Sequence, residues 1–252
     1  MNFITKDLSF FDCNSFIGNH LNPYVDSPFE LNMLENTTKT SCLKGSLVYH
    51  SASVLYDASY GNKKLIEGTK NRSDLYLVWV AIPELCNSEK EAELFLSQII
   101  ENKISSIKIF PRYHNYNVCT GALEILLPFL DEEKIPLLVN QEEISWDEIT
   151  YILGKFKNIP FLLQNTGYRM ERFIIPFFNM YKNFYLDISR YQAHGGIEYL
   201  CSQFGSERIF FGSGMPLFSP EPIMMMINNA NISVEEKQNI SNKNLLRLLD
   251  RG

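Results

Sequence analysis

The stretch Phe10-Phe11-Asp12-Cys13-Asn14-Ser15-Phe16-Ile17-Gly18-Asn19 begins as an apolar run, turns polar at Asp12 and ends in a Gly/Asn loop. This change of character is typical of a buried parallel strand whose carboxyl end delivers side chains into a pocket. We therefore predict a first strand over 9–12, followed by a loop that carries polar groups. Seven later stretches repeat the pattern, and the predicted fold follows from this repetition.

The seven further apolar runs that end in polar groups lie at 45–50, 75–82, 106–110, 135–139, 159–163, 183–186 and 208–211. Each is followed by a stretch with helical spacing, and the pairs Ser88/Glu91 and Ser145/Glu148 have capping-box spacing. Strict alternation of strands and helices implies a parallel sheet with right-handed crossovers. Eight such units in 252 residues match a closed barrel, which typically has about 250 residues.

The predicted fold class is therefore α/β, a single (β/α)8 TIM barrel spanning 1–252, with a terminal amphipathic helix over 233–249. The alternative is an open, doubly wound sheet. That fold prefers a Gly-rich phosphate loop after the first strand, and the segment 12–19 contains only Gly18. The barrel is the favoured prediction.

Composition excludes several classes of function. The net charge of −6 without any dense Lys/Arg cluster gives no reason to expect nucleic acid as a partner. No apolar run approaches the ~20 residues of a membrane span, and the segment 1–7 lacks the pattern of a signal peptide. Five widely spaced cysteines without a C-x-x-C pair indicate reduced thiols and a cytoplasmic protein. We expect a small-molecule substrate or ligand.

In a (β/α)8 barrel the site forms at the carboxyl ends of the strands. The polar residues at these predicted ends are Asp12, Asn14, His50, Lys108, Arg112, His114, Asn140, Gln164, Asn165, Asp187, Ser189 and Ser213. Many could merely satisfy backbone groups where loops begin. The charged or titratable members His50, Lys108, Arg112 and His114 favour function, because burying such groups is costly unless they are paired or used.

Four other features have simpler explanations. His20 and His194 lie farther along their loops and are interpreted as solvated loop residues. Cys13 lies near the expected pocket and could be a nucleophile, but a buried inert thiol is favoured because no activating charge is evident. The run Met224-Met225-Met226 indicates a packed core helix, since consecutive residues face different sides of a helix.

Several segments together resemble the amidohydrolase superfamily, specifically the amidohydrolase-related barrels. They are Phe11-Asp12-Cys13-Asn14-Ser15-Phe16-Ile17-Gly18, Val48-Tyr49-His50-Ser51, Pro136-Leu137-Leu138-Val139-Asn140, Tyr185-Leu186-Asp187-Ile188-Ser189 and Glu207-Arg208-Ile209-Phe210-Phe211-Gly212-Ser213-Gly214-Met215-Pro216. The last is similar to the family's closing strand, which ends in a Gly-Ser-Asp-x-Pro pattern. Their order and spacing carry the likeness over nearly the whole chain.

The resemblance implies one or two divalent metals, and this sequence departs from the implied ligands. Asn14 and Phe16 stand at the His-x-His positions, and Gly214 replaces the closing Asp. The implied histidines after strands five and six correspond to Asn140 and to Gln164 or Asn165, while Lys108 could match a ligand on strand four. Zinc prefers imidazole, thiolate or carboxylate. We therefore predict a degenerate metal site with no tightly bound metal.

The favoured function is a hydrolase or lyase that acts without the ancestral metal on a small polar or carboxylate-bearing molecule. His50 or His114 would be the general acid/base, and Asp12 or Asp187 would orient a histidine or accept a proton. Lys108 and Arg112 would hold an anionic group. The substrate-binding candidates also include the amides and hydroxyl of Asn14, Asn140, Gln164 and Ser213.

Two alternatives stay open. A metal-free barrel that binds a sugar-like ligand without chemistry would suit the amide-rich pocket, and it gains if the charged groups do not converge on one point. A metal hydrolase with rearranged ligands such as His50, His114 and Asp187 predicts bound zinc or another divalent metal. The aromatic segment 173–181 would suit a homodimer interface or packing on the barrel.

Overall fold

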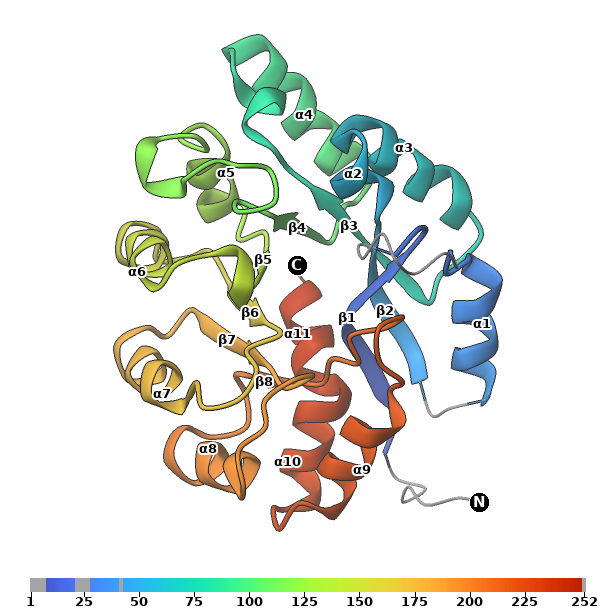
Figure 1. The fold of residues 1–252 in the computed structure, drawn as a ribbon, viewed down its shortest axis with the longest axis vertical. Coiled ribbons are helices and arrows are strands. Elements are labelled where there is room, and N and C mark those ends of the chain that lie inside the picture. Colours follow the sequence, from blue (N-terminus) through green and yellow to red (C-terminus); the bar gives the residue numbers. More distant parts are fainter. Residues whose placement is uncertain (1–7, 21–27, 41–42, 251–252) are drawn as a thin grey trace.

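The computed structural model describes residues 8–20, 28–40 and 43–250. Within these ranges eight parallel strands follow one another in chain order around one sheet (Figure 1). Their bounds are β1 Phe10–Ile17, β2 Leu43–His50, β3 Leu75–Val80, β4 Ser106–Ile109, β5 Leu137–Asn140, β6 Phe161–Gln164, β7 Phe184–Asp187 and β8 Ile209–Phe210. The predicted (β/α)8 barrel is confirmed. The segment 1–7, on which the signal-peptide interpretation rests, lies outside the described residues.

Helices follow the strands and, apart from α11 near the middle of the view, lie around the outside of the barrel (Figure 1). Their bounds are α1 Leu31–Thr40, α2 Ala52–Leu55, α3 Ala58–Thr69, α4 Glu89–Glu101, α5 Leu126–Glu132, α6 Trp146–Lys155, α7 Glu171–Met180, α8 Gly196–Phe204, α9 Glu221–Asn229, α10 Val234–Gln238 and α11 Asn244–Leu249. Ser88 and Ser145 are N-caps as expected, and Ser145 forms a full capping box with Glu148. No helix in the described part of the chain has both the length and the apolar character that crossing a membrane requires.

Hydrogen bonds between β1 and the segment after β8 close the barrel. The backbone N–H of Cys13 donates to Phe211 O (3.0 Å), and that of Phe16 donates to Met215 O (3.1 Å). Ser15 and Met215 also form a parallel bridge. Closure removes the two free sheet edges that an open sheet would expose, and it brings residues near 12–16 beside residues 211–215.

Side chains alternate between two cores along the strands, as the pleat requires. Those on one face, such as Val48, Trp79 and Leu163, join the core beneath the helices. Those on the other face fill the barrel interior, where the buried members are Cys13, Phe16, Leu47, Tyr49, Val54, Val78, Val80, Phe110, Leu138, Leu162, Phe210 and Leu245. The interior is therefore packed with side chains and leaves room only at its ends.

The terminal helix closes the amino end of the barrel. Residues 233–249 form the predicted helical run, with a π-helical turn at Asn239–Lys243 between α10 and α11. Leu245 is 2% exposed and packs into the barrel interior, with Leu248 and Leu249 beside it. The carboxyl end of the barrel is thus the end left for a site, as the position of the polar residues predicted.

One local prediction was wrong. β1 continues to Ile17 instead of ending at 12, because Ser15 finds a buried partner in Ser46 (Oγ to Oγ 2.7 Å) across an irregular register. After β2, the segment 51–60 contains α2 and the start of α3, which Asp57 caps by accepting from Tyr60 N (2.7 Å). After β4, the next α-helix begins only at α5, since Gly121 has a left-handed φ of 86°.

Candidate functional site

A layer of polar side chains lies inside the carboxyl end of the barrel. Asn140 on β5 is in register with Gln164 on β6, one pleat repeat beyond the apolar pair Leu138 and Leu162. Lys108 reaches the same level from β4. The alternation that fills the barrel with apolar groups therefore continues into amide and charged groups where the strands end.

Lys108 is the central member of this layer. Its side chain is 2% exposed, and Nζ donates to Asn140 Oδ1 (3.0 Å) and Gln164 Oε1 (2.6 Å). Nζ also lies 5.0 Å from the ring centroid of Tyr49 and 5.5 Å from that of Phe110, within the range of cation–π attraction. Burial lowers the pKa of Lys108 to about 8, although the negative charge of Asp187 opposes the shift.

Asp12 joins the first strand to the segment after the last. Its Oδ1 accepts from the backbone N–H groups of Asn14 (2.9 Å) and Ser213 (2.8 Å), while Oδ2 accepts from the Ser213 hydroxyl. Burial raises the pKa of Asp12 to about 7 against the opposite effect of these bonds. Both residues are completely buried. Asp12 and Ser213 therefore hold the closure together below the cavity described next.

Asp187 organises a second buried network at the end of β7. Its Oδ2 accepts from Asn14 Nδ2 (2.8 Å) and Ser189 Oγ (2.6 Å), and Oδ1 accepts from Ser189 N (2.7 Å). Burial raises the pKa of this carboxyl. A Cβ at Gly212 would lie 2.1 Å from Asp187 Oδ1, so glycine is required there. The Asn14 amide also donates to Asn165 Oδ1 (3.1 Å).

A cavity of about 380 Å³ opens above these networks. Amide, charged and aromatic groups face it together. The lining residues are Asn14, Phe16, His20, Tyr49, Asn140, Glu142, Asn165, Arg190, Gly214, Met215, Leu217 and Phe218. A concave site with apolar walls and a few polar groups is typical of small-molecule binding.

Of the predicted site residues, the structure places Asn14 and Asn140 on the cavity wall. Lys108 and Gln164 lie behind the wall, where Gln164 also donates to Cys13 O (2.6 Å). Asp12, Asp187 and Ser213 are buried beneath it, bonded in the two networks above. Cys13 is buried, and burial raises the pKa of its thiol well above the ordinary value, which fits an inert thiol.

The two histidines predicted as acid/base candidates and Arg112 do not line this cavity. His50 Nδ1 accepts from Ala52 N (3.1 Å), and burial lowers the His50 pKa. His114 Nε2 lies 3.2 Å from Val54 O, and exposed Arg112 points a guanidinium nitrogen at Glu142 O (3.5 Å). These groups lie apart from one another and do not converge on one point.

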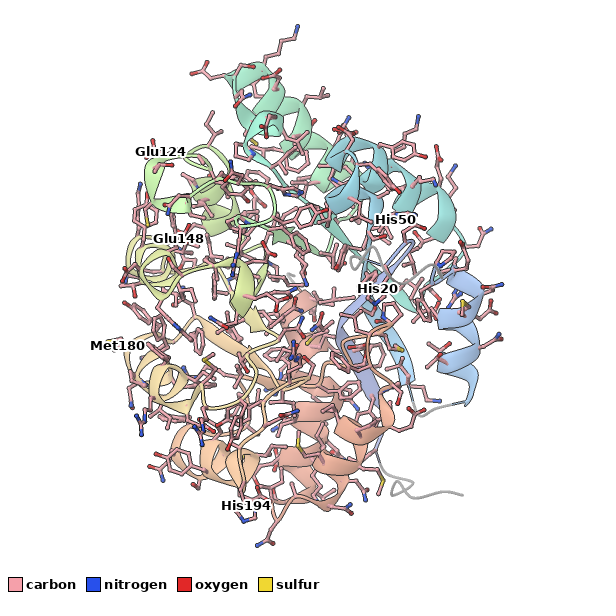
Figure 2. All side chains as sticks on the ribbon, in the orientation of Figure 1. His20, His50, Glu124, Glu148, Met180 and His194 are labelled. Atoms are coloured by element: carbon pink, nitrogen blue, oxygen red, sulfur yellow. The ribbon has the colours of Figure 1, made fainter. Side chains whose placement is uncertain are left out.

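His20 lies at the cavity, where His50 or His114 was expected. It lines the cavity wall and packs edge-on against Phe16, with ring centroids 6.4 Å apart. Figure 2 shows His20 beside the strand ends of the barrel, His50 near α2 and α3, and His194 at the outer edge near α8. The interpretation of His20 as a solvated loop residue is therefore replaced by a position on the cavity wall.

Sequence reasoning also missed Arg190 and Glu142, which both line the cavity. The Arg190 guanidinium lies 5.6 Å from the Phe218 ring centroid. Among the described residues no carboxylate forms an ion pair with it. Each of these charged residues lies two or three positions beyond a strand end, and a search of such loop starts as well as the strand ends would have found them.

The metal that the resemblance implies does not fit the residues present. Phe16 and Gly214 offer no donor atom. The carboxamide oxygens of Asn140 and Gln164 accept from the Lys108 ammonium, whose positive charge disfavours a second cation beside it. Within residues 8–20, 28–40 and 43–250, no three His, Cys, Asp or Glu side chains are grouped as a metal site would need.

A second hollow of about 440 Å³ lies at the opposite end of the barrel, near α11. Its wall includes Lys134, Glu207 and Arg247, together with apolar Tyr185 and Phe210. Arg247 is already bonded to Asn239 Oδ1 (3.2 Å) and Asn244 Oδ1 (2.5 Å). Parallel barrels place their chemistry at the carboxyl ends of strands. The candidate site is therefore the cavity of about 380 Å³ at that end, which we call the mouth cavity.

Comparisons with protein-family models and with curated protein sequences found no match. Solved structures match over nearly the full length. An uncharacterised TIM-barrel protein from Bordetella bronchiseptica has a TM-score of 0.76 and 15% identity, covering 97% of this chain and 99% of that one. An amidohydrolase II has a TM-score of 0.75 and 13% identity, with coverages of 96% and 99%.

A third match is a dihydroxybenzoic acid decarboxylase from a Polaromonas species, with bound manganese and the inhibitor 2-nitroresorcinol. It has a TM-score of 0.66 and 12% identity, covering 96% of each chain. The chain is thus a (β/α)8 barrel with the same fold as these structures, one of which is an amidohydrolase II, and the predicted resemblance is confirmed at the level of the fold. Identities this low show the fold alone, so the function must be argued from the site.

Proposed function

We propose that this chain takes up a small carboxylate-bearing molecule in the mouth cavity and acts on it as a lyase or hydrolase without a bound metal. The observation that carries the proposal is the Arg190 guanidinium on the cavity wall, which no carboxylate of the described residues neutralises. Guanidinium groups bind carboxylates through two parallel hydrogen bonds. A ligand carboxylate would supply the missing partner.

The side-chain amide of Asn165 adds a neutral hydrogen-bond donor to the cavity wall that carries the Arg190 guanidinium. Asp187 can only accept when ionised, so it fixes the amide nitrogen of Asn14 toward itself. That nitrogen also donates to Asn165 Oδ1 (3.1 Å). The Asn165 oxygen is therefore occupied, and its amide N–H groups are left for the cavity. An acceptor-rich ligand suits this arrangement.

Aromatic side chains form the apolar part of the cavity wall. Phe16 and Tyr49 lie with ring centroids 5.4 Å apart, and Phe218 stacks against Arg190. Ring faces of this kind favour a planar ligand. The structural neighbour with manganese is a dihydroxybenzoic acid decarboxylase, which makes aromatic carboxylates the first ligands to test.

His20 and Glu142 are the residues on the cavity wall that could move a proton. Histidine titrates nearest neutral pH, and a carboxylate can accept a proton from a ligand hydroxyl or water. The roles first expected of His50 and His114 pass to His20 in this proposal, because the cavity is lined by His20 and by neither of the others. A general acid or base must lie within hydrogen-bond reach of the ligand, directly or through one water.

Arg190→Met tests the binding part of the proposal. Ligand-observed NMR with benzoate should show about a tenfold or greater loss of affinity, because a charge-assisted bidentate contact is removed. Arg169→Met is the matched control. Arg169 also stacks on an aromatic ring, 5.1 Å from the centroid of Tyr168, and does not line the cavity. Equal affinity in the wild type and Arg190→Met would refute carboxylate recognition by Arg190.

His20→Gln tests turnover. Hydroxybenzoates are incubated with metal-depleted protein, and carbon dioxide release and product formation are followed by NMR. We expect turnover in the wild type, its loss in His20→Gln, and retention in His194→Gln, since His194 lies at the outer edge of the molecule. Turnover that appears only after a divalent metal is added would contradict the metal-free part of the proposal.

The second candidate is a barrel that binds its ligand without chemistry. It is favoured by one observation, the lack of convergence among Lys108, Arg112, His50 and His114, each of which is bonded to a different partner. Tight ligand binding without product under every condition would make this candidate the better account.

A further inference from the structure

Lys108 carries a charge at a buried position where a neutral side chain would cost less free energy to bury. Its ammonium is enclosed by the barrel and contacts two neutral carboxamides and two aromatic faces. No carboxylate of the described residues forms an ion pair with it. Burying an ammonium without such a partner is unfavourable because the charge loses its hydration, so packing alone does not explain a lysine at this position.

The hydrogen bonds of Lys108 fix the orientation of the amides around it. An ammonium can only donate, so Asn140 and Gln164 must both turn their oxygens toward Nζ. Gln164 then uses its nitrogen to donate to Cys13 O (2.6 Å). Asn140 differs, because it lines the cavity and no acceptor in the described part of the chain takes its amide nitrogen. Its N–H groups are left for a ligand.

We infer that Lys108 is a positioning residue that determines specificity: its ammonium turns Asn140 so that the amide N–H groups face the cavity, which therefore selects a carboxylate over the corresponding neutral amide. The inference rests on the proposed function and deepens it. Arg190 supplies charge at one part of the wall, and Asn140 supplies an oriented donor at another. With a neutral residue at 108, Asn140 could rotate and present either its oxygen or its nitrogen.

The charged groups around Lys108 define the pH range of the effect. Burial lowers the pKa of Lys108 to about 8, while the carboxylates of Asp187, Glu142 and Glu143 favour the protonated amine. The Cys13 thiol is neutral in this range, because burial raises its pKa well above the ordinary value. Asp12 lies in the same buried layer, and burial raises its pKa to about 7. Loss of the Lys108 proton would let Asn140 turn, so carboxylate selectivity should fall as the pH rises through this range.

The test compares the affinities for benzoate and benzamide, which differ only in the group that Asn140 would contact. Ligand-observed NMR gives the ratio of the two affinities. Lys108→Met should lower the benzoate preference by about tenfold, and the decline of that preference with rising pH should disappear. Lys90→Met, which removes an exposed lysine of α4, should leave both unchanged. An unchanged ratio and pH profile in Lys108→Met would overturn the inference.

Asn140→Asp covers the case in which Lys108→Met does not fold. The substitution keeps the shape and gives Lys108 a charged partner, but it replaces the donor at the cavity by an acceptor. We expect benzoate binding to fall by more than tenfold (roughly) while benzamide binding is retained. Equal losses for the two ligands, or no loss for either, would contradict the assigned orientation of Asn140.

Failure of the proposed function would be seen separately. If the wild type binds neither benzoate nor benzamide, the proposed ligand class fails, and the side-chain amide signals of Asn140 then decide the inference. Lys108→Met should shift these signals and broaden them through rotation, and raising the pH through about 8 should do the same in the wild type. Asn140 signals unaffected by either change would overturn the role of Lys108.

Discussion

At the scale of the residue, Asp12 shows how burial alters a carboxyl group that also holds the barrel closed. Burial raises its pKa to about 7, although bonds from Asn14 and Ser213 favour the ionised form. An acid whose pKa is raised on folding stabilises the fold below its unfolded pKa, and this contribution is lost as the pH rises through the folded pKa. The relevant window runs from the ordinary value of 3.8 to about 7.

We therefore expect the free energy of unfolding of Asp12→Asn, relative to that of the wild type, to increase by roughly 1–3 kcal/mol as the pH rises through this window. Asparagine keeps an oxygen for the two backbone N–H groups and carries no charge. Urea denaturation of both proteins at several pH values measures the difference. Asp57→Asn, at the exposed N-cap of α3, is the control. A difference between Asp12→Asn and wild type that does not vary with pH would contradict the raised pKa.

At the scale of the element, α11 covers the amino end of the barrel. Its residue Leu245 is 2% exposed and is counted with the barrel interior, whereas Arg247 on the same helix is exposed. The helix is amphipathic in sequence, as predicted, but its buried stripe packs into the barrel and not onto the outer face of the strands. Stability should therefore depend on this short terminal helix.

Leu245→Ala should lower the free energy of unfolding by about 2–5 kcal/mol, because it removes a buried side chain and leaves a cavity in a packed interior. Thermal and urea denaturation measure the loss. Leu94→Ala on α4, where leucine is 59% exposed, should change stability by about 0.5 kcal/mol or less. Similar effects of the two substitutions would show that α11 does not seal the barrel.

At the scale of the whole molecule, the barrel shares its fold with a structural neighbour that contains bound manganese. Here the ammonium of Lys108 lies between the neutral amides of Asn140 and Gln164, at strand ends where the resemblance implies metal ligands. A fixed positive charge and amide donors make a poor site for a divalent cation.

Protein purified without chelator should therefore contain zinc, manganese and iron far below one equivalent by mass spectrometry of the metals. Its melting temperature should not change on adding a chelator, because a metal that binds only the folded state would otherwise add stability. Near-stoichiometric metal that is lost together with thermal stability would refute the metal-free reading. The ligands would then be sought among His50, His114, Asp12, Asp187 and Lys108.

The sequence by itself determined the barrel and the strands whose ends carry polar groups. These follow from local patterns, since apolar runs that end in polar groups repeat eight times. It did not determine β1 beyond 12, because the Ser15–Ser46 pair joins residues far apart in the chain. Nor could it show that His20 and Arg190 line the cavity while His50 and His114 do not.

Only the tertiary structure decided which polar strand ends bind one another and which line the cavity. Asp12 pairs with Ser213 across the barrel closure, and Lys108 on β4 donates to Asn140 on β5 and to Gln164 on β6. The physical reason is that a side chain's direction depends on loop paths and on the hydrogen-bond partners that folding brings near. Periodicity specifies which residues are buried, but it contains no information on which buried groups meet.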